Sequence, residues 1–225
     1  MSPLSPPPKA ADKTKAVTKF SVFDYQAWFN EPIFEPARLF TAITPIYRTL
    51  LKWNISAQDV KYPGGATNPT DTLVTLQLVN NHYALNLSLA GMSFKAEYVD
   101  WSQASVITEI IETSSMNMKT ALGVEFAKYQ LQIVLQLVLE GKSIKELTKN
   151  LASPFVHPPT DVDFYGLLLQ AGDVVFMLDK SAINPNGIFV RITHTFKGGT
   201  SMPEMAKVLY EDESWLANTL GIEIV

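Results

Sequence analysis

Histidine is the residue type best suited to chemistry near neutral pH, as an acid, a base or a metal ligand. The chain has three histidines and no cysteine, which excludes thiolate metal sites, cysteine catalysis and disulfides. His157 precedes Asp161 and Asp163 in a proline-rich loop, and one histidine with two carboxylates can hold zinc or iron. Because such loops are common without a metal and no second histidine is near, we predict neither a metal nor another cofactor.

His194 belongs to an alternating segment at 187–196. It shares parity with Ile192 and Phe196, so the alternation predicts that it points toward the apolar face of a strand. There it is either a hydrogen-bonded core residue or part of a pocket wall. Arg191 has the opposite parity and is expected on the polar face, while His82 falls beside a predicted turn.

Sequence signatures of catalysis and of phosphate binding do not occur in the chain. It lacks the nucleophile elbow Gly-x-Ser-x-Gly, the phosphate loop Gly-x4-Gly-Lys-Ser/Thr, the dinucleotide motif Gly-x-Gly-x-x-Gly and the zinc motif His-Glu-x-x-His. We therefore predict that the chain is not an enzyme.

The charge balance argues against nucleic-acid binding. The first 19 residues hold four of the 18 basic side chains and one of the 22 acidic ones, which leaves 14 basic and 21 acidic residues in the remainder. Phosphate backbones require clustered lysine and arginine, and this remainder is acidic. No stretch has the ~20 apolar residues of a membrane-spanning helix, and no apolar leader is found, so we expect a cytoplasmic protein without membrane contact.

Residues 1–19 are expected to form a disordered tail, because they hold four prolines and four lysines and lack an apolar pattern. Removing residues 1–18 should then leave the melting temperature nearly unchanged. The remaining residues, 20–225, have the length of a single domain with a substantial core. An aromatic-rich strand is predicted at 20–29, followed by a helix that Pro45 should kink or split into two short helices.

Alternation is clearest between residues 74 and 98. Apolar residues occupy every second position at 74–78, 83–89 and 94–98, and Asn80-Asn81 and Ala90-Gly91 supply turns. This pattern predicts a three-stranded antiparallel meander. Since one face is apolar and the other polar, helices are expected to cover only one side.

A long strand is predicted at 126–139, where apolar residues occupy alternate positions that begin at Ala127. Helical spacing would distribute the glutamines of this segment over every side. Period two instead places Gln130, Gln132 and Gln136 together on one polar face.

The order of elements then repeats in the second half of the chain. The predicted elements are a short helix with a capping box at Ser143 and Glu146, strands at about 163–170, 174–179 and 187–196, a helix capped by Thr200 or Ser201, and a short strand at 222–225. Halves at 20–120 and 124–220 would each contain a β-α-βββ-α unit, although their residues hardly match. The predicted fold class is α+β: an antiparallel sheet, with a meander and a long central strand, and helices packed on one face. Internal duplication stays open.

The leading functional hypothesis is a non-catalytic protein–protein interaction or assembly protein of the adaptor or accessory type. It would bind through Gln130, Gln132, Gln136, Arg191 and His194, because neutral amides suit contact better than reaction. Unpaired edges of long strands, such as 126–139, would support it. Charged residues make up only 18% of the chain, so we expect a protein partner to cover part of the surface, with a homodimer as the simplest arrangement.

The alternative is a small-molecule-binding α+β protein or enzyme with an apolar cavity between sheet and helices. Tyr83, Tyr129, Phe176 and His194 would line that cavity. A hollow of several hundred Å³ with His194 in its wall favours this class, whereas a filled core and paired strand edges favour the interaction protein.

Overall fold

A computed structural model describes residues 13–79, 81–99, 104–141, 143–144, 146–147 and 166–225. His157, Asp161 and Asp163 lie outside these residues, as do residues 1–12. The strands are β1 (Thr14–Phe29), β2 (Val60–Lys61), β3 (Thr72–Leu78), β4 (Tyr83–Ser88), β5 (Gly91–Glu97), β6 (Phe126–Leu139), β7 (Gly166–Ala171), β8 (Val174–Lys180), β9 (Gly187–Lys197) and β10 (Ile222–Ile224). The α-helices are α1 (Pro36–Leu50), α2 (Ala104–Leu122) and α4 (Met202–Leu220), and short 3-10 helices cover Leu51–Trp53 and Ala57–Asp59.

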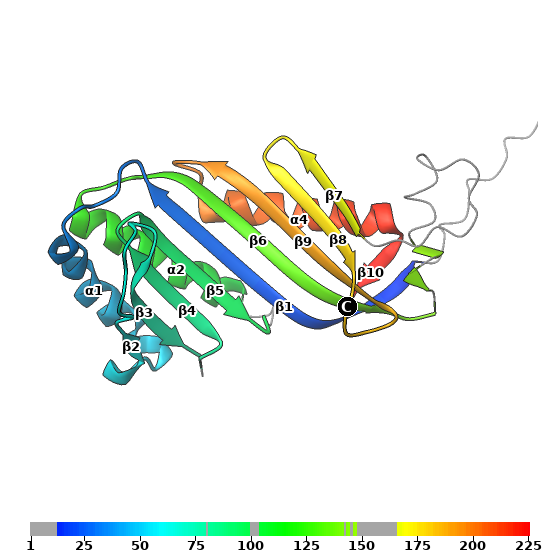
Figure 1. Cartoon of the computed structure of the whole chain (residues 1–225), viewed down its shortest axis with the longest axis horizontal. Helices are drawn as coiled ribbons and strands as arrows, with labels where there is room; N and C mark the ends of the chain where they lie inside the picture. Colours follow the sequence, from blue (N-terminus) through cyan, green and yellow to red (C-terminus); the bar gives the residue numbers. More distant parts are fainter. Residues whose placement is uncertain (1–12, 80, 100–103, 142, 145, 148–165) are drawn as a thin grey trace, which may run out of the picture.

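The described strands belong to one sheet in the order β2-β3-β4-β5-β1-β6-β9-β8-β7, and β10 pairs with β1. Neighbours run antiparallel except β10, which is parallel to β1. The long strands β1 and β6 lie side by side across the middle of the sheet (Figure 1). The predicted α+β class, the meander and the long central strand are confirmed.

The strand order is symmetric about the pair β1 and β6. Outward from β1 follow β5, β4 and β3, and outward from β6 follow β9, β8 and β7, which are the last, middle and first meander strands of each half. A helix of 19 residues follows each meander, α2 in the first half and α4 in the second. In the second half, Ile144, Glu146 and Leu147 are helical at the position in the chain order that α1 has in the first. The topology therefore repeats the β-α-βββ-α unit.

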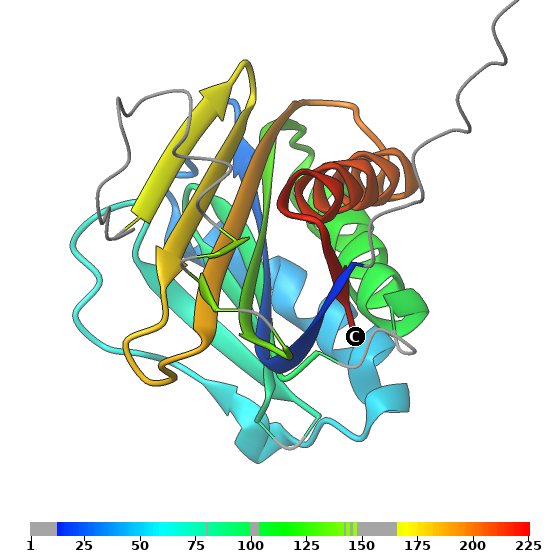
Figure 2. The same cartoon turned by 90° about the vertical axis from the view of Figure 1, so that its right-hand side faces the viewer.

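The three α-helices lie on one face of the sheet (Figure 2). α1 begins at Pro36, whose missing N–H is not needed in a first turn, and it buries Leu39, Ile43 and Ile46 at helical spacing. Pro45 lies inside α1, which continues to Leu50. A proline removes one intrahelical hydrogen bond and leaves its neighbours, so the expected division into two short helices does not occur.

Capping residues begin and end the helices at positions that the sequence predicted. Ser201 and Glu204 form a capping box at the start of α4. The same reciprocal hydrogen bonds join Ser143 and Glu146. Gly221 ends α4 with φ 66°, a left-handed conformation that glycine adopts without strain, and the chain turns directly into β10.

The two faces of β6 follow its period-two pattern with one local exception. Alternate residues from Tyr129 to Leu139 are buried, and the glutamines lie between them. Near the start of the strand the pairing with β1 shifts register beside Phe29, so Phe126 is buried and Ala127 is exposed. The predicted inward position of Ala127 is wrong because this irregularity reverses the parity.

Strand β1 begins at Thr14, well before the predicted start at Phe20. Its first residues pair with β10 and with the end of β6, and Ala16 is fully buried. The register with β6 shifts between Thr18 and Phe20, which breaks the alternation that the sequence would otherwise show. The assignment of residues 14–19 to a tail is therefore wrong.

Candidate binding groove

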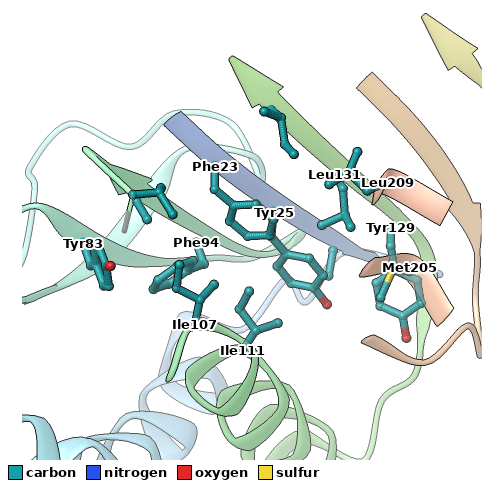
Figure 3. Close-up of a cluster of buried hydrophobic side chains, with 14 of the residues drawn as sticks. Phe23, Tyr25, Tyr83, Phe94, Ile107, Ile111, Tyr129, Leu131, Met205 and Leu209 are labelled. Atoms are coloured by element: carbon teal, nitrogen blue, oxygen red, sulfur yellow. The ribbon is translucent and has the colours of Figure 1, made fainter. Parts of the chain in front are cut away.

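A groove runs between α2 and α4 on the helix-covered face. α2 packs against α1 but hardly against α4, and two pockets lie between the two long helices. The start of α2 shares a pocket with α4 residues as far along as Glu213, whereas the end of α2 shares one with the first turn of α4, so the helices run antiparallel. β1 and β6 form the floor, and Figure 3 shows their side chains Phe23, Tyr25, Tyr129 and Leu131.

One end of the groove is an apolar pocket of about 360 Å³. Its floor contains Phe23, Leu131 and Ile133 from the two central strands. Its walls include Ile107 of α2 and Leu209 of α4, which Figure 3 shows in the same apolar cluster as Phe23 and Leu131. Alternation in the strands and helical spacing in the walls thus converge on one apolar surface.

Glu213 of α4, which is half-buried, also lines this apolar pocket. Burial raises the pKa of the Glu213 carboxyl above its ordinary value, and no hydrogen bond or nearby charge from the described residues offsets the effect. An uncompensated carboxyl in a cleft is more typical of functional positions than of structural ones.

The helical pattern of α4 contains a signal for this residue that the sequence analysis missed. Met205, Leu209, Leu216 and Leu220 form the buried stripe of α4. Glu213 occupies the position of that stripe between Leu209 and Leu216, four residues after the first and three before the second. An acidic residue at a core position of an amphipathic helix is unexpected unless another group pairs with it.

Replacing Glu213 with glutamine is expected to raise the melting temperature near neutral pH. Because the folded-state pKa of Glu213 lies above the ordinary 4.5, the chain loses stability as pH rises from that value through the folded pKa. An amide escapes this loss, so E213Q and the wild type should melt together at about pH 4 and diverge toward about pH 8. A gap of equal size at both ends of the range would show that the carboxylate charge is not its cause.

The other end of the groove is a larger and more polar pocket of about 500 Å³. The hydroxyl oxygen of Tyr25 lies 3.5 Å from Ser115 Oγ. Burial raises the pKa of Tyr25 far above its ordinary value, which keeps the phenol neutral. Met202 lines both pockets, so the two pockets adjoin along the groove, and Met116 lies at the edge of this end, 70% exposed.

Four of the five predicted binding residues lie on the face of the sheet opposite the helices. They are Gln130, Gln132 and Gln136 on β6 and Arg191 on β9, all half-buried. Thr193 donates a hydrogen bond to Gln132 Oε1 at 3.2 Å, and Arg191 Nη2 lies 3.0 Å from Met177 Sδ. These contacts run between neighbouring strands, and none of the four residues lines the groove.

His194 points toward α4, the direction that its parity predicts. Its Nδ1–H donates a hydrogen bond to Asp212 Oδ2 at 2.7 Å, and its ring stacks on Phe196 with centroids 4.4 Å apart. A histidine–aspartate pair can orient a general base for a nucleophile. Among the residues that the structure describes, no hydroxyl or thiol is hydrogen-bonded to the other ring nitrogen. The pair instead ties α4 to β9.

The four residues predicted to line one cavity are dispersed. Tyr129 lines the polar end of the groove, Phe176 packs on Trp215 with ring centroids 4.8 Å apart, and Tyr83 is buried beneath the first meander. His194 does not line the apolar pocket. β6 also offers no free edge, because β1 and β9 pair with its two sides. The sheet does face the two pockets of the groove, but of the four predicted residues only Tyr129 lines them.

No three side chains of the metal-ligating types gather in the described parts of the chain. None of the helices described there is both long and apolar enough to cross a membrane.

Comparisons with known proteins give little support to any family assignment. No family model and no curated protein matches the chain. Among solved structures, the chain is similar to one described as Methanococcus jannaschii TBP, with a TM-score of 0.33 and 13% identity over 92% of this chain and 98% of that chain. A likeness of this size carries no functional argument, so the groove has to be interpreted from its own residues.

Proposed function

We propose that the chain is a non-catalytic, cytoplasmic binding protein that takes a segment of a partner protein into the groove between α2 and α4. The observation that carries this proposal is the pair of largely apolar pockets between α2 and α4, two long helices that hardly pack on each other. Neighbouring helices on a sheet normally bury their apolar sides by direct packing. An unfilled apolar pocket between them favours an occupant supplied from outside.

The length of the groove suits a peptide segment better than a compact metabolite. Its lining runs from Ala104 to Thr120 along α2, which at about 1.5 Å per residue is roughly 24 Å. About seven residues of extended chain, or about four turns of helix, fit this length. Tyr210, which lines the apolar pocket, is 71% exposed, so this end also opens to solvent.

Methionine supplies an adaptable part of the groove surface. Met116 stands exposed on α2, and Met202 and Met205 are buried on α4 beside the groove. An unbranched thioether fills irregular spaces and adjusts to partners of different shape. This lining supports recognition of a protein segment through apolar contact.

A small-molecule ligand is the second candidate, because the apolar pocket alone has the volume that such ligands occupy. A catalytic role has less support. The pair His194 and Asp212 does not line the groove, and the neutral phenol of Tyr25 is a poor base.

Photo-cross-linking from position 206 tests the proposal. Ala206 lines the apolar pocket, whereas the side chain of its neighbour Lys207 is 77% exposed and lines neither pocket. A benzophenone side chain at position 206 should cross-link, in cells of the native host, to one recurrent segment of a partner protein. The same group at position 207 is the matched control and should not enrich that segment.

The identity of the cross-linked species distinguishes the alternatives. A recurrent small-molecule adduct at position 206 would favour the second candidate, and a peptide from the chain itself would indicate self-association through the groove. Equal, unselective cross-linking from positions 206 and 207 would contradict a binding role for the groove.

Self-association through β7 is a separate expectation. In the described part of the chain β7 pairs with β8 alone, and Leu168 is 66% exposed. An antiparallel pair of β7 strands from two copies would have twofold symmetry and would extend both sheets. Light scattering in ~0.15 M salt should show the mass rising from 25.0 kDa toward twice that value with concentration, and Leu168→Lys should prevent the rise. A constant monomer mass would leave only a different protein as partner.

A further inference from the structure

We infer that the partner segment presents a basic side chain, lysine or arginine, between aliphatic residues, and that its cationic group pairs with Glu213 inside the groove. This inference rests on the proposed function and adds the chemistry by which the groove selects its occupant. Glu213 lines the same pocket as Phe23, Leu131 and Ile133, and no described residue pairs with its carboxyl group.

The described residues of the chain supply no cation to Glu213. α2 and α4 carry one lysine each and no arginine. Lys119, at the other end of the groove, lies 2.6 Å from Glu125, and the exposed Lys207 lies 3.9 Å from Glu211. The described lining of the apolar pocket contains no basic residue. Since no described residue offers a cation to this carboxyl group, an occupant of the groove is the source that we propose.

The charge of the two helices is complementary to a basic segment. Against their two lysines, α2 and α4 hold six acidic residues: Glu109, Glu112, Glu204, Glu211, Asp212 and Glu213. Lys52 pairs with Glu109, Lys207 with Glu211 and His194 with Asp212, and Glu204 caps α4. The net field along the groove is still negative, so it attracts a cationic segment and repels an acidic one. Because Glu213 alone among the six lines the apolar pocket, it fixes where along the groove the base is placed.

Because the Glu213 carboxyl group is partly shielded from water, it can discriminate between a basic and a neutral side chain of the partner segment. A carboxylate held among apolar side chains has lost water and gained no hydrogen bond from the chain. An incoming lysine or arginine forms a charge-assisted hydrogen bond, whereas a neutral side chain leaves the carboxylate unpaired. Aliphatic residues beside the base would pack against Ile107 and Leu209, which form the walls of the same pocket.

Three synthetic peptides test the inference by isothermal titration calorimetry with the full chain. Each is acetylated and amidated at its ends and alternates leucine and serine around a central lysine, glutamine or glutamate. The lysine peptide is expected to bind at least about tenfold more tightly than the glutamine peptide, and the glutamate peptide should bind most weakly. In E213Q the lysine and glutamine peptides should bind about equally.

Two further variants separate this inference from its alternatives. Glu211→Gln removes the same charge from an exposed position of α4 and should retain the preference for lysine. Ala206→Trp fills the apolar pocket and should abolish binding of every peptide. Because E213Q is expected to fold at least as well as the wild type, a lost preference cannot be attributed to unfolding.

Each remaining outcome decides against the inference. Equal affinity of the three peptides, abolished by Ala206→Trp, would overturn it and leave the groove function intact. A preference for lysine that survives E213Q would place the cation elsewhere and also overturn it. Failure of all three peptides to bind would overturn it too, and cross-linking from position 206 would then decide the proposed function independently.

Discussion

Replacing Leu135 with alanine is expected to lower the free energy of unfolding by about 2–5 kcal/mol, measured by urea denaturation. Leu135 is 2% exposed and lies on β6, paired with Ser21 of β1 and Val190 of β9. The shorter side chain loses apolar contacts and leaves a cavity. Strands that are paired on both sides cannot move far enough to close it.

Gln132→Ala on the same strand is the matched control. Gln132 faces away from the helices and accepts a hydrogen bond from Thr193 Oγ1. Losing that half-buried contact should change the free energy of unfolding by about 1 kcal/mol or less. Comparable losses at positions 132 and 135 would contradict the assignment of an apolar and a polar face to β6.

Alternation of apolar and polar residues predicted the strands that bury one face and leave the other face more exposed. The meander β3 to β5 and the long strand β6 show this, since every second residue meets the helices. The same rule placed His194 on the helix-covered face. It failed at Ala127, where a change of register against β1 shifts the parity by one residue.

The groove could not be predicted from periodicity, because it depends on how far apart two helices lie. α2 and α4 each present an apolar stripe, and that pattern is the same whether the stripes meet or leave a channel. The acidic residue within the stripe was a local signal. Glu213 conflicts with its apolar neighbours on α4, and such conflicts are expected at functional positions.

The internal repeat was visible in the order of elements but not in the residues. Pairing and burial constrain which positions are apolar, not which apolar residue fills them, so the two halves retain a common topology without residue identity. The symmetric strand order places β1 and β6 at the centre and α2 and α4 on either side of the groove. The proposed binding site therefore uses both halves, and neither half alone could form it.

Removing residues 1–19 is expected to lower the melting temperature by roughly 6–12 °C. The segment 14–19 joins β10 to the sheet through backbone hydrogen bonds at 2.8–2.9 Å, from Thr14 to Gly221, from Val225 to Ala16 and from Thr18 to Val225. At about 1 kcal/mol for each hydrogen bond, their loss amounts to about 3 kcal/mol, and 1 kcal/mol corresponds to about 2–4 °C in a chain of this size. The composition of residues 1–19 predicts the opposite result, no change, because prolines and lysines conceal a strand whose register with β6 shifts before Phe20.

Removal of residues 1–12 alone is the matched control for this truncation. It keeps β1 from Thr14 onward, and its composition predicts a melting temperature close to that of the full chain. β10 follows α4 directly, so the longer truncation should also loosen the wall of the groove that carries Glu213 and weaken peptide binding. Equal melting temperatures for the two truncated chains would show that the sheet does not depend on residues 14–19 and that the strand effectively begins near Phe20.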